Sequence, residues 1–335
     1  MRVSPCCGTK GRSHGTRRLL CTHCGQTWRP RPKRRGRKKK RTRASLAESV
    51  MDGNSSLRGI ARKRKASHEK IRRRFHASLK VWLSRQIPPQ IPEKKYLIAV
   101  LDAVWFKLGR KKKPYTSFVV LLRPLDEQYA AVALIHTIPG RETKRNWEKV
   151  INKLPKEAQG RILAVVSDGF TGLIGIAEKR GWHFQWCHVH IKRRMSELRG
   201  LRKLPGRRIR RRITKLLYIF LETADEKKSQ RALAEIRKLF ASPDCPRSIP
   251  PRLSGVVKRS QLFRTYRTVP ELNLPISTNS AENINSQIKR RLSTMRGLRS
   301  AKSLTYWLSV IYKSTKPVRC RGYKNTKKYH QISVS

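Results

Sequence analysis

The chain has 335 residues, and its 80 lysines and arginines against 20 acidic residues give a formal net charge of +60. This charge indicates a polyanionic partner, because each phosphate contact releases counterions and adds affinity. A ribosomal protein and a basic membrane-surface protein are the alternatives. No apolar stretch reaches the roughly 18 residues that a membrane span needs, and the N-terminus lacks the apolar core of a signal peptide. We therefore expect a cytoplasmic, nucleoid-associated protein of two or three domains that is not embedded in a membrane.

Four of the seven cysteines lie in the first 30 residues. Cys21 and Cys24 are separated by two residues and followed by Gly25, the pattern of a zinc knuckle with a tight turn. The expected mate, Ser4-Pro5-Cys6-Cys7-Gly8, has a serine where its first cysteine would stand. Residues 1–30 are thus predicted to form a zinc-ribbon-like knuckle that binds Zn²⁺ through Cys7, Cys21 and Cys24. The fourth ligand is left open between Cys6, His14 and none, and a decayed knuckle without metal is the alternative.

A basic linker over residues 31–43 leads into a predicted helix-turn-helix DNA-binding domain over residues 44–90. Ser67 has the character of a helix N-cap, and Ile71 and Phe75 are spaced to face back onto a first helix. Lys65 stands where a glycine is usual in the turn. A basic helical hairpin is the alternative. The second helix would present three candidate DNA-binding residues: Arg72, Arg73 and Arg74.

The pattern changes to strands from residue 94. Three apolar, β-branched or aromatic runs are followed by alternating helical and strand patterns. The expected elements, in chain order, are strands at Tyr96–Phe106, Tyr115–Leu122 and Tyr129–Ile138, a helix near Thr143–Leu154, a strand at Arg161–Ser167, a helix at Leu173–Arg180 and a strand at Trp182–Trp186. This order predicts an α/β protein with an RNase H-like mixed-sheet core over residues 94–187. An all-α insertion would follow at 188–272, then core helices at 273–320 and a basic tail at 321–335.

Three acidic residues stand out at the ends or starts of these elements. Asp102 and Asp168 each follow an apolar run, and Glu282 lies early in the amphipathic pattern Asn279–Met295. A carboxylate against an apolar core costs several kcal/mol unless it is paired, and a pair of divalent metal ions would be such a partner. A capping box between Asn279 and Glu282 is the structural alternative for the glutamate.

Four segments carry a resemblance to a known family: Leu101-Asp102, Ser167-Asp168-Gly169, Trp186–His190 and Thr278–Asn285. Over about residues 94–315 the sequence resembles the Mutator-like DDE transposases of bacterial insertion sequences. The resemblance implies that Asp102, Asp168 and Glu282 bind Mg²⁺ or Mn²⁺ and catalyse DNA strand cleavage and strand transfer. The resemblance also implies that the partner is double-stranded DNA, both the ends of the element and the target. Holding two ends at once requires a homodimer or higher oligomer on DNA.

Further residues are expected to support this site. Cys187 and His190 are predicted to position it, because two ligands do not make a zinc site; simple core packing of Cys187 is the alternative. Asn279 and Asn285 are given the same positioning role. The glycines at 169, 172 and 175 do not match a nucleotide-binding fingerprint. The remaining candidate DNA contacts are Arg208, Arg211, Lys289 and Arg290. Alternative functions are a domesticated, inactive DNA-binding regulator and a structure-specific nuclease.

Overall fold

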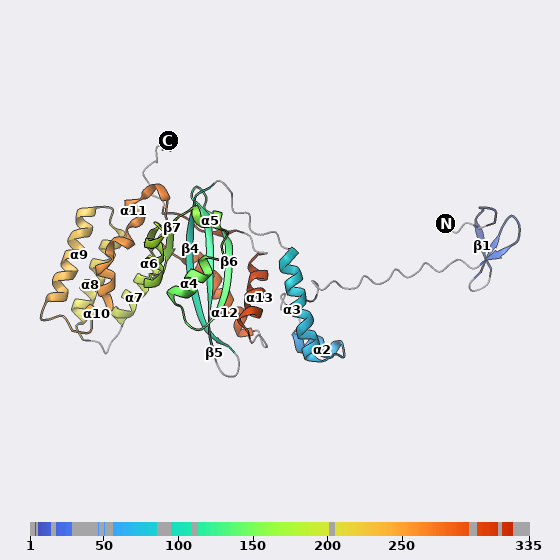
Figure 1. Cartoon of the computed structure of the whole chain (residues 1–335), viewed down its shortest axis with the longest axis horizontal. Helices are drawn as coiled ribbons and strands as arrows, with labels where there is room; N and C mark the ends of the chain where they lie inside the picture. The colour runs from blue at the N-terminus through green and yellow to red at the C-terminus, as the bar shows by residue number, and fades with distance from the viewer. Residues whose placement is uncertain are drawn as a thin grey trace. The chain divides into compact units, whose positions relative to one another are not determined.

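The computed structural model describes residues 4, 6–14, 18–28, 46, 50, 56–85, 95–108, 113–200, 205–294, 300–313 and 317–323. The chain divides into two compact units, residues 1–78 and 79–335 (Figure 1). The basic linker predicted at 31–43 lies outside the described residues, as does the tail beyond residue 323. No helix in the described ranges is long and apolar enough to cross a membrane.

The N-terminal unit begins with a three-stranded antiparallel sheet of β1 (Gly11–His14), β2 (Arg18–Cys21) and β3 (Thr27–Trp28). The turn between β2 and β3 closes with a hydrogen bond from Cys21 N–H to the Gln26 carbonyl, 2.9 Å. Gly25 adopts a φ of +70° in this turn, a conformation that favours glycine. The sequence Cys21–Gly25 therefore forms the tight turn that its pattern predicted.

Two helices follow: α2 (Leu57–Lys63) lies in the same unit, and α3 (His68–Arg85) begins in it and continues past residue 78 into the second. Ser56 caps α2 by accepting from Gly59 N–H, and Ser67 accepts from Lys70 N–H at the start of α3. The apolar positions that the periodicity selected are buried: Ile60, Ala61, Ile71 and Phe75. The two helices and their short turn match the expected arrangement, while its role as a DNA-binding helix-turn-helix stays a prediction.

The turn between α2 and α3 places a side chain in a strained backbone conformation. Lys65 has a φ of +44°, a region in which a Cβ costs roughly 1–2 kcal/mol. Lys65 therefore adopts the positive-φ conformation that a glycine at this position of the turn would adopt.

We expect Lys65→Gly to stabilise the helix pair by roughly 0.5–1 kcal/mol, because glycine removes the Cβ clash at the cost of some unfolded-state entropy. Hydrogen exchange of the full chain, followed on peptides covering residues 56–85, would measure this as slower exchange. Arg64→Gly is the matched control, since Arg64 has a φ of −99° and should lose protection. Equal effects of the two substitutions would contradict the turn geometry.

The second unit is built on a six-stranded mixed sheet. Its strand order is β8-β7-β4-β5-β6-β9. β7 runs parallel to β4 and β8, and the other neighbours are antiparallel. The strands span β4 Leu97–Leu108, β5 Lys113–Pro124, β6 Tyr129–Pro139, β7 Ile162–Ser167, β8 His183–Trp186 and β9 Val318–Arg319. The α/β class predicted from the sequence is confirmed.

Helices cover both faces of this sheet (Figure 1). On β4, Leu97, Ala99 and Leu101 join the apolar core formed with α4 (Lys144–Ile151), α5 (Lys156–Gly160) and α6 (Thr171–Lys179). Because side chains alternate along a strand, Val100 and Asp102 point to the opposite face. There α12 (Asn279–Thr294) packs on β4 and β5, and α13 (Ala301–Lys313) packs on β6. Asp102 thus lies beneath α12.

The described residues of the segment predicted as an all-α insertion, 188–272, form helices joined by short turns and loops, without a strand. Apolar residues of α8 and α9 belong to the same core as the residues between the sheet and α4. Among them are Ile213, Leu217 and Ile236. The helices are α7 His188–Gly200, α8 Arg207–Glu222, α9 Glu226–Ala241, α10 Pro250–Lys258 and α11 Thr265–Thr268, with short 3-10 turns at Ser260–Phe263 and Pro270–Leu272. This packing joins the segment to the sheet unit.

Candidate functional site

The parallel pairing of β4 and β7 brings two of the predicted catalytic residues together. Val100 lies opposite Val166 in this pairing, and Asp102 and Asp168 each follow two residues later. With a side-chain period of two, Asp102 lies on the face that carries α12, and Asp168 directly follows β7 at the same end of this strand pair. The negative charge of Asp168 accordingly raises the pKa of Asp102.

Asp102 is the most deeply buried of the three predicted catalytic carboxylates, with 7% of its surface exposed. Burial raises its pKa to about 7, and the charges of Asp168 and Glu282 act in the same direction. Hydrogen bonds from Asn285 Nδ2, 2.8 Å, and from Ala103 N–H, 2.9 Å, oppose this rise. A buried acid beside two other acids is a site that a divalent cation would stabilise.

Asp168 is held by the turn that follows β7. Its Oδ1 accepts from the Ser167 hydroxyl at 3.2 Å and from Phe170 N–H at 3.1 Å. Trp186 Nε1 donates to the Asp168 carbonyl at 2.5 Å. Gly169 has a φ of +89°, and a Cβ there would overlap the Trp186 indole. The glycine therefore permits the close approach of Trp186 that fixes the backbone of Asp168.

Glu282 lies in the first turn of α12 and is held from two directions. Thr278, the residue before the helix, donates its hydroxyl to Glu282 Oε1 at 3.1 Å. His190 Nε2 of α7 lies 2.9 Å from the same oxygen. Asn279 is the exposed first residue of α12. The contacts of Glu282 thus differ from the capping box with Asn279, since its Oε1 is engaged by side chains.

Within the described residues, two groups of possible metal ligands have all their ligand atoms within 4.8 Å of one another. One is the N-terminal cysteine cluster, and the other consists of Cys187, His190 and Glu282. Glu282 therefore groups with the two residues predicted to position it rather than with both aspartates. Asn285, by contrast, contacts Asp102 directly, in agreement with a positioning role.

Sequence reasoning missed a further acid near Asp168. Burial raises the pKa of Glu142 to about 7, and the charge of Asp168 adds to the rise. Trp147 Nε1 donates to Glu142 Oε1 at 2.6 Å. The only signal in the sequence is an acid placed between a strand and Thr143, the N-cap of α4. That pattern is common at helix starts, so it does not point to a site.

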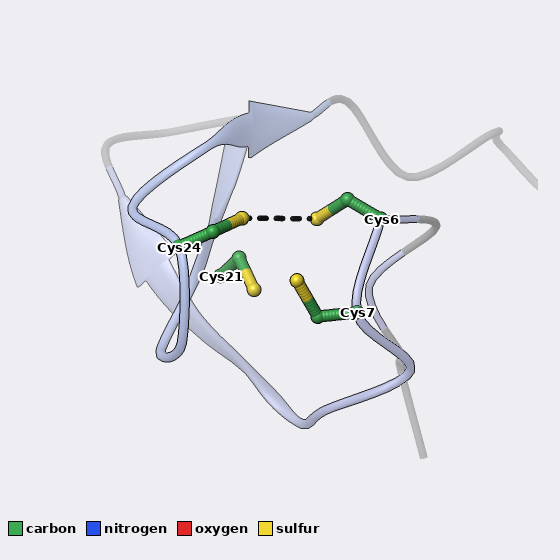
Figure 2. Close-up of side chains that lie close together, drawn as sticks. All are labelled: Cys6, Cys7, Cys21 and Cys24. Carbon is green, nitrogen blue, oxygen red and sulfur yellow. Dashed lines mark hydrogen bonds between the residues drawn. The ribbon is translucent and has the colours of Figure 1, made fainter.

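The N-terminal cysteines converge as Figure 2 shows, with Cys6 and Cys7 facing Cys21 and Cys24. Sulfurs bound to one tetrahedral zinc at about 2.3 Å lie about 4 Å apart, so this all-thiol set fits Zn²⁺. Cys6 takes the place that the sequence left open, with its sulfur 3.3 Å from that of Cys24. His14 ends β1 outside the cluster.

Ser4 has a different part in the knuckle from the cysteine it replaces. Its hydroxyl accepts from Cys7 N–H at 3.3 Å and lies 3.5 Å from the Cys21 sulfur. Hydrogen bonds with the Ser4 and Thr9 hydroxyls lower the pKa of Cys21 to about 5, whereas that of Cys7 is raised to about 12, chiefly by Cys24. Thiolate is the form that binds zinc, so the lowered pKa of Cys21 favours a role as a metal ligand.

A comparison with protein families shows the family to which the chain belongs. The model of the family described as Transposase, Mutator family matches residues 55–316. The chain belongs to this family. Its general function is therefore DNA transposition, with DNA as a partner and a requirement for a divalent metal. A search of curated proteins found no match. The matched range includes α2, α3, the sheet and the helical segment, and the cysteine cluster precedes it.

The predicted DNA contacts of this transposase lie on three helices. On α3, Arg72 Nη2 and Arg73 Nε lie 2.8 Å and 3.4 Å from Glu69 Oε1, and Arg74 is exposed. Arg208 and Arg211 are exposed on α8, as are Lys289 and Arg290 on α12. Exposure is compatible with phosphate contacts, and their role in this transposase stays a prediction.

We expect Cys6→Ser to weaken or abolish zinc binding by the knuckle, because it removes one of four thiolates, whereas His14→Asn should leave it intact. Elemental analysis of the purified transposase after dialysis against zinc-free buffer measures the change. Cys320→Ser is the control for a cysteine outside the cluster. Loss of zinc from His14→Asn but not from Cys6→Ser would overturn the ligand set.

Because the pKa of Asp102 is raised, we expect the stability of the metal-free protein to depend on pH. Its folded-state pKa of about 7 exceeds the ordinary 3.8, so its contribution is most favourable at low pH and is lost as the pH rises through 7. The free energy of unfolding that Asp102→Asn adds relative to the wild type should therefore grow by roughly 2 kcal/mol between about pH 5.5 and 8.5. Denaturant unfolding with a chelator present measures it.

The control for this titration is Asp244→Asn, at an exposed position after α9. Mg²⁺ at about pH 8.5 should stabilise the wild type but not Asp102→Asn, because metal binding requires the ionised carboxylate. A gain from Asp102→Asn that is the same at both pH values would contradict the environment described for this acid.

Proposed function

We propose that this transposase cleaves and joins DNA strands at a two-metal site formed by Asp102, Asp168 and Glu282. The observation that carries the proposal is the buried Asp102 carboxylate, 7% exposed, on the strand whose parallel neighbour ends directly before Asp168. The charges of Asp168 and Glu282 disfavour the ionised form of Asp102, and cations would offset that cost. The strand order β6-β5-β4-β7-β8 with parallel β4 and β7 supports the RNase H-like assignment of the core.

The chemistry has two displacements at phosphorus. Water first adds its oxygen to the phosphodiester at the element end, and the bond to the 3′ oxygen breaks to free a 3′-OH. That hydroxyl then attacks a target phosphodiester and displaces the target strand's 3′ oxygen. When bound, Mg²⁺ or Mn²⁺ would activate the attacking oxygen and stabilise the leaving one. Both steps are in-line displacements, so one site serves both.

In this proposal, other residues of the protein hold the Asp102 and Asp168 carboxylates in position. Asn285 donates to Asp102 Oδ2 at 2.8 Å, which fixes the carboxylate plane beneath α12. The Ser167 hydroxyl and Phe170 N–H fix Asp168 Oδ1. Asp102 must release its proton to the solvent before it can hold a cation, so the occupied site favours neutral to alkaline pH.

This proposal assigns DNA recognition to the knuckle and to the exposed basic residues of α3 and α8. The α2–α3 pair, with Arg73 and Arg74 exposed on α3, would bind the terminal inverted repeats together with the knuckle. The exposed Arg208 and Arg211 of α8 would add phosphate contacts. Two element ends require two sites, so the active form is proposed to be a dimer or higher oligomer on DNA.

The alternatives make different products. A structure-specific nuclease with the same metals would release a 3′-OH but join nothing. An inactive regulator would bind the ends and do neither. A strand-transfer assay with the inverted repeats that flank the protein's own gene separates all three.

In that assay we expect Asp168→Asn to lower cleavage and joining together by at least about 100-fold, since it removes a charge that acts on the reacting phosphate. Asn285→Ala should cost about 10- to 100-fold, as expected for a residue that orients a metal ligand. Asn283→Ala, on the exposed side of the same helix, is the matched control. Cleavage without joining would favour the nuclease, and full activity of Asp168→Asn would refute the proposed site.

A further inference from the structure

Cys187, His190 and Glu282 form a compact group from three separate segments. Cys187 directly follows β8, His190 lies in the first turn of α7, and Glu282 lies in the first turn of α12. Their thiol, imidazole and carboxylate ligand atoms all lie within 4.8 Å of one another. Cys187 and Glu282 are 95 residues apart in the sequence, so only the folded chain, in which the start of α12 meets the start of α7, brings the third donor to the pair.

The hydrogen bonding of this group is incomplete. His190 Nε2 is buried and has no hydrogen-bond partner, although it lies 2.9 Å from Glu282 Oε1. The Thr278 hydroxyl is 3.3 Å from the Cys187 sulfur and 3.1 Å from Glu282 Oε1, but it carries a single proton for both. The contact of His190 Nε2 with Glu282 Oε1 therefore lacks hydrogen-bond geometry, and a buried ring nitrogen that is not hydrogen-bonded is costly. Its proximity to two other electron-pair donors suggests that a cation belongs between them.

We propose that Cys187, His190 and Glu282 bind one Zn²⁺ ion at a site separate from the N-terminal knuckle. A sulfur, a nitrogen and an oxygen donor suit zinc, and three protein ligands leave a fourth tetrahedral position open. Thiolate and imidazole are poor ligands for Mg²⁺, which prefers oxygen. On binding, the Cys187 thiol releases its proton to the solvent, and His190 binds through its neutral ring.

This site shares Glu282 with the proposed two-metal centre, and in that respect it rests on the proposed function. A zinc ion bound by Glu282 Oε1 would fix the side chain that α12 carries toward the aspartates. Cys187 and His190 would then hold the Glu282 side chain in place through the shared zinc ion. Zinc binding itself requires neither Asp102 nor Asp168, so the two ideas fail separately.

The test counts zinc in the full chain after loading with Zn²⁺ and dialysis against zinc-free buffer containing excess Mg²⁺. We expect two zinc ions per wild-type chain and one in His190→Asn, with His183→Asn as the matched control that keeps two, since His183 is exposed on β8. Cys21→Ser/Cys24→Ser, which removes the knuckle, should also keep one. Combining it with His190→Asn should leave none.

A spectroscopic arm identifies the thiolate. In the Cys21→Ser/Cys24→Ser chain loaded with Co²⁺, Cys187→Ser should abolish the thiolate-to-cobalt charge-transfer band, and Cys245→Ser should retain it. Circular dichroism confirms folding, and Glu282→Gln provides a second ligand variant if Cys187→Ser does not fold. One zinc per wild-type chain, or two in His190→Asn, would overturn the inference. If the zinc count holds but strand transfer does not depend on Asp168, the proposed function fails and the zinc site stands.

Discussion

The placement of a carboxylate between a sheet and a helix constrains most of the second unit. Asp102 lies on the β4 face that α12 covers, and its charge is opposed there by burial and by two acidic neighbours. Asn285 is the α12 side chain that contacts it. Any shift of α12 along the sheet would separate this pair and leave the carboxylate without its amide donor. The position of the helix and the environment of the acid are therefore coupled.

That coupling extends to Glu282, which lies one turn earlier on α12. Its Oε1 meets Thr278 and His190, so the helix start is tied to α7 as well as to β4. Cys187 joins the same group through Thr278, whose N–H donates to the sulfur at 3.3 Å. The Cys-x-x-His pair is thereby connected to Glu282 by side-chain contacts.

The knuckle obeys a different constraint. A segment of fewer than 30 residues buries too little apolar surface to hold a fold alone, and here Leu19 and Cys21 are the buried residues of β2. A metal ion bound by the convergent cysteines would compensate, because metal binding adds directly to folding free energy. Ser4 illustrates how the set tolerates a missing thiol: its hydroxyl bonds to the knuckle while Cys6, two residues later, brings its sulfur to the group.

The sequence by itself determined the elements and the acids at their ends. Apolar, β-branched and aromatic runs predicted the five main strands to within a few residues, and the cap Ser67 marked the start of its helix. These signals depend on neighbours only a few residues away. The family followed from short motifs. The helix-turn-helix and RNase H-like assignments remain predictions that the element order supports.

The tertiary structure decided which side chains meet. The choice of Cys6 over His14, the approach of Glu142 to Asp168 and the grouping of Glu282 with Cys187 and His190 all depend on strand register and helix packing. Glu282 and Cys187 are far apart along the chain, and no local pattern encodes the distance between them. A spacing of two residues could identify a pair of ligands in the sequence, but the third donor comes from a helix that only the folded chain brings beside them.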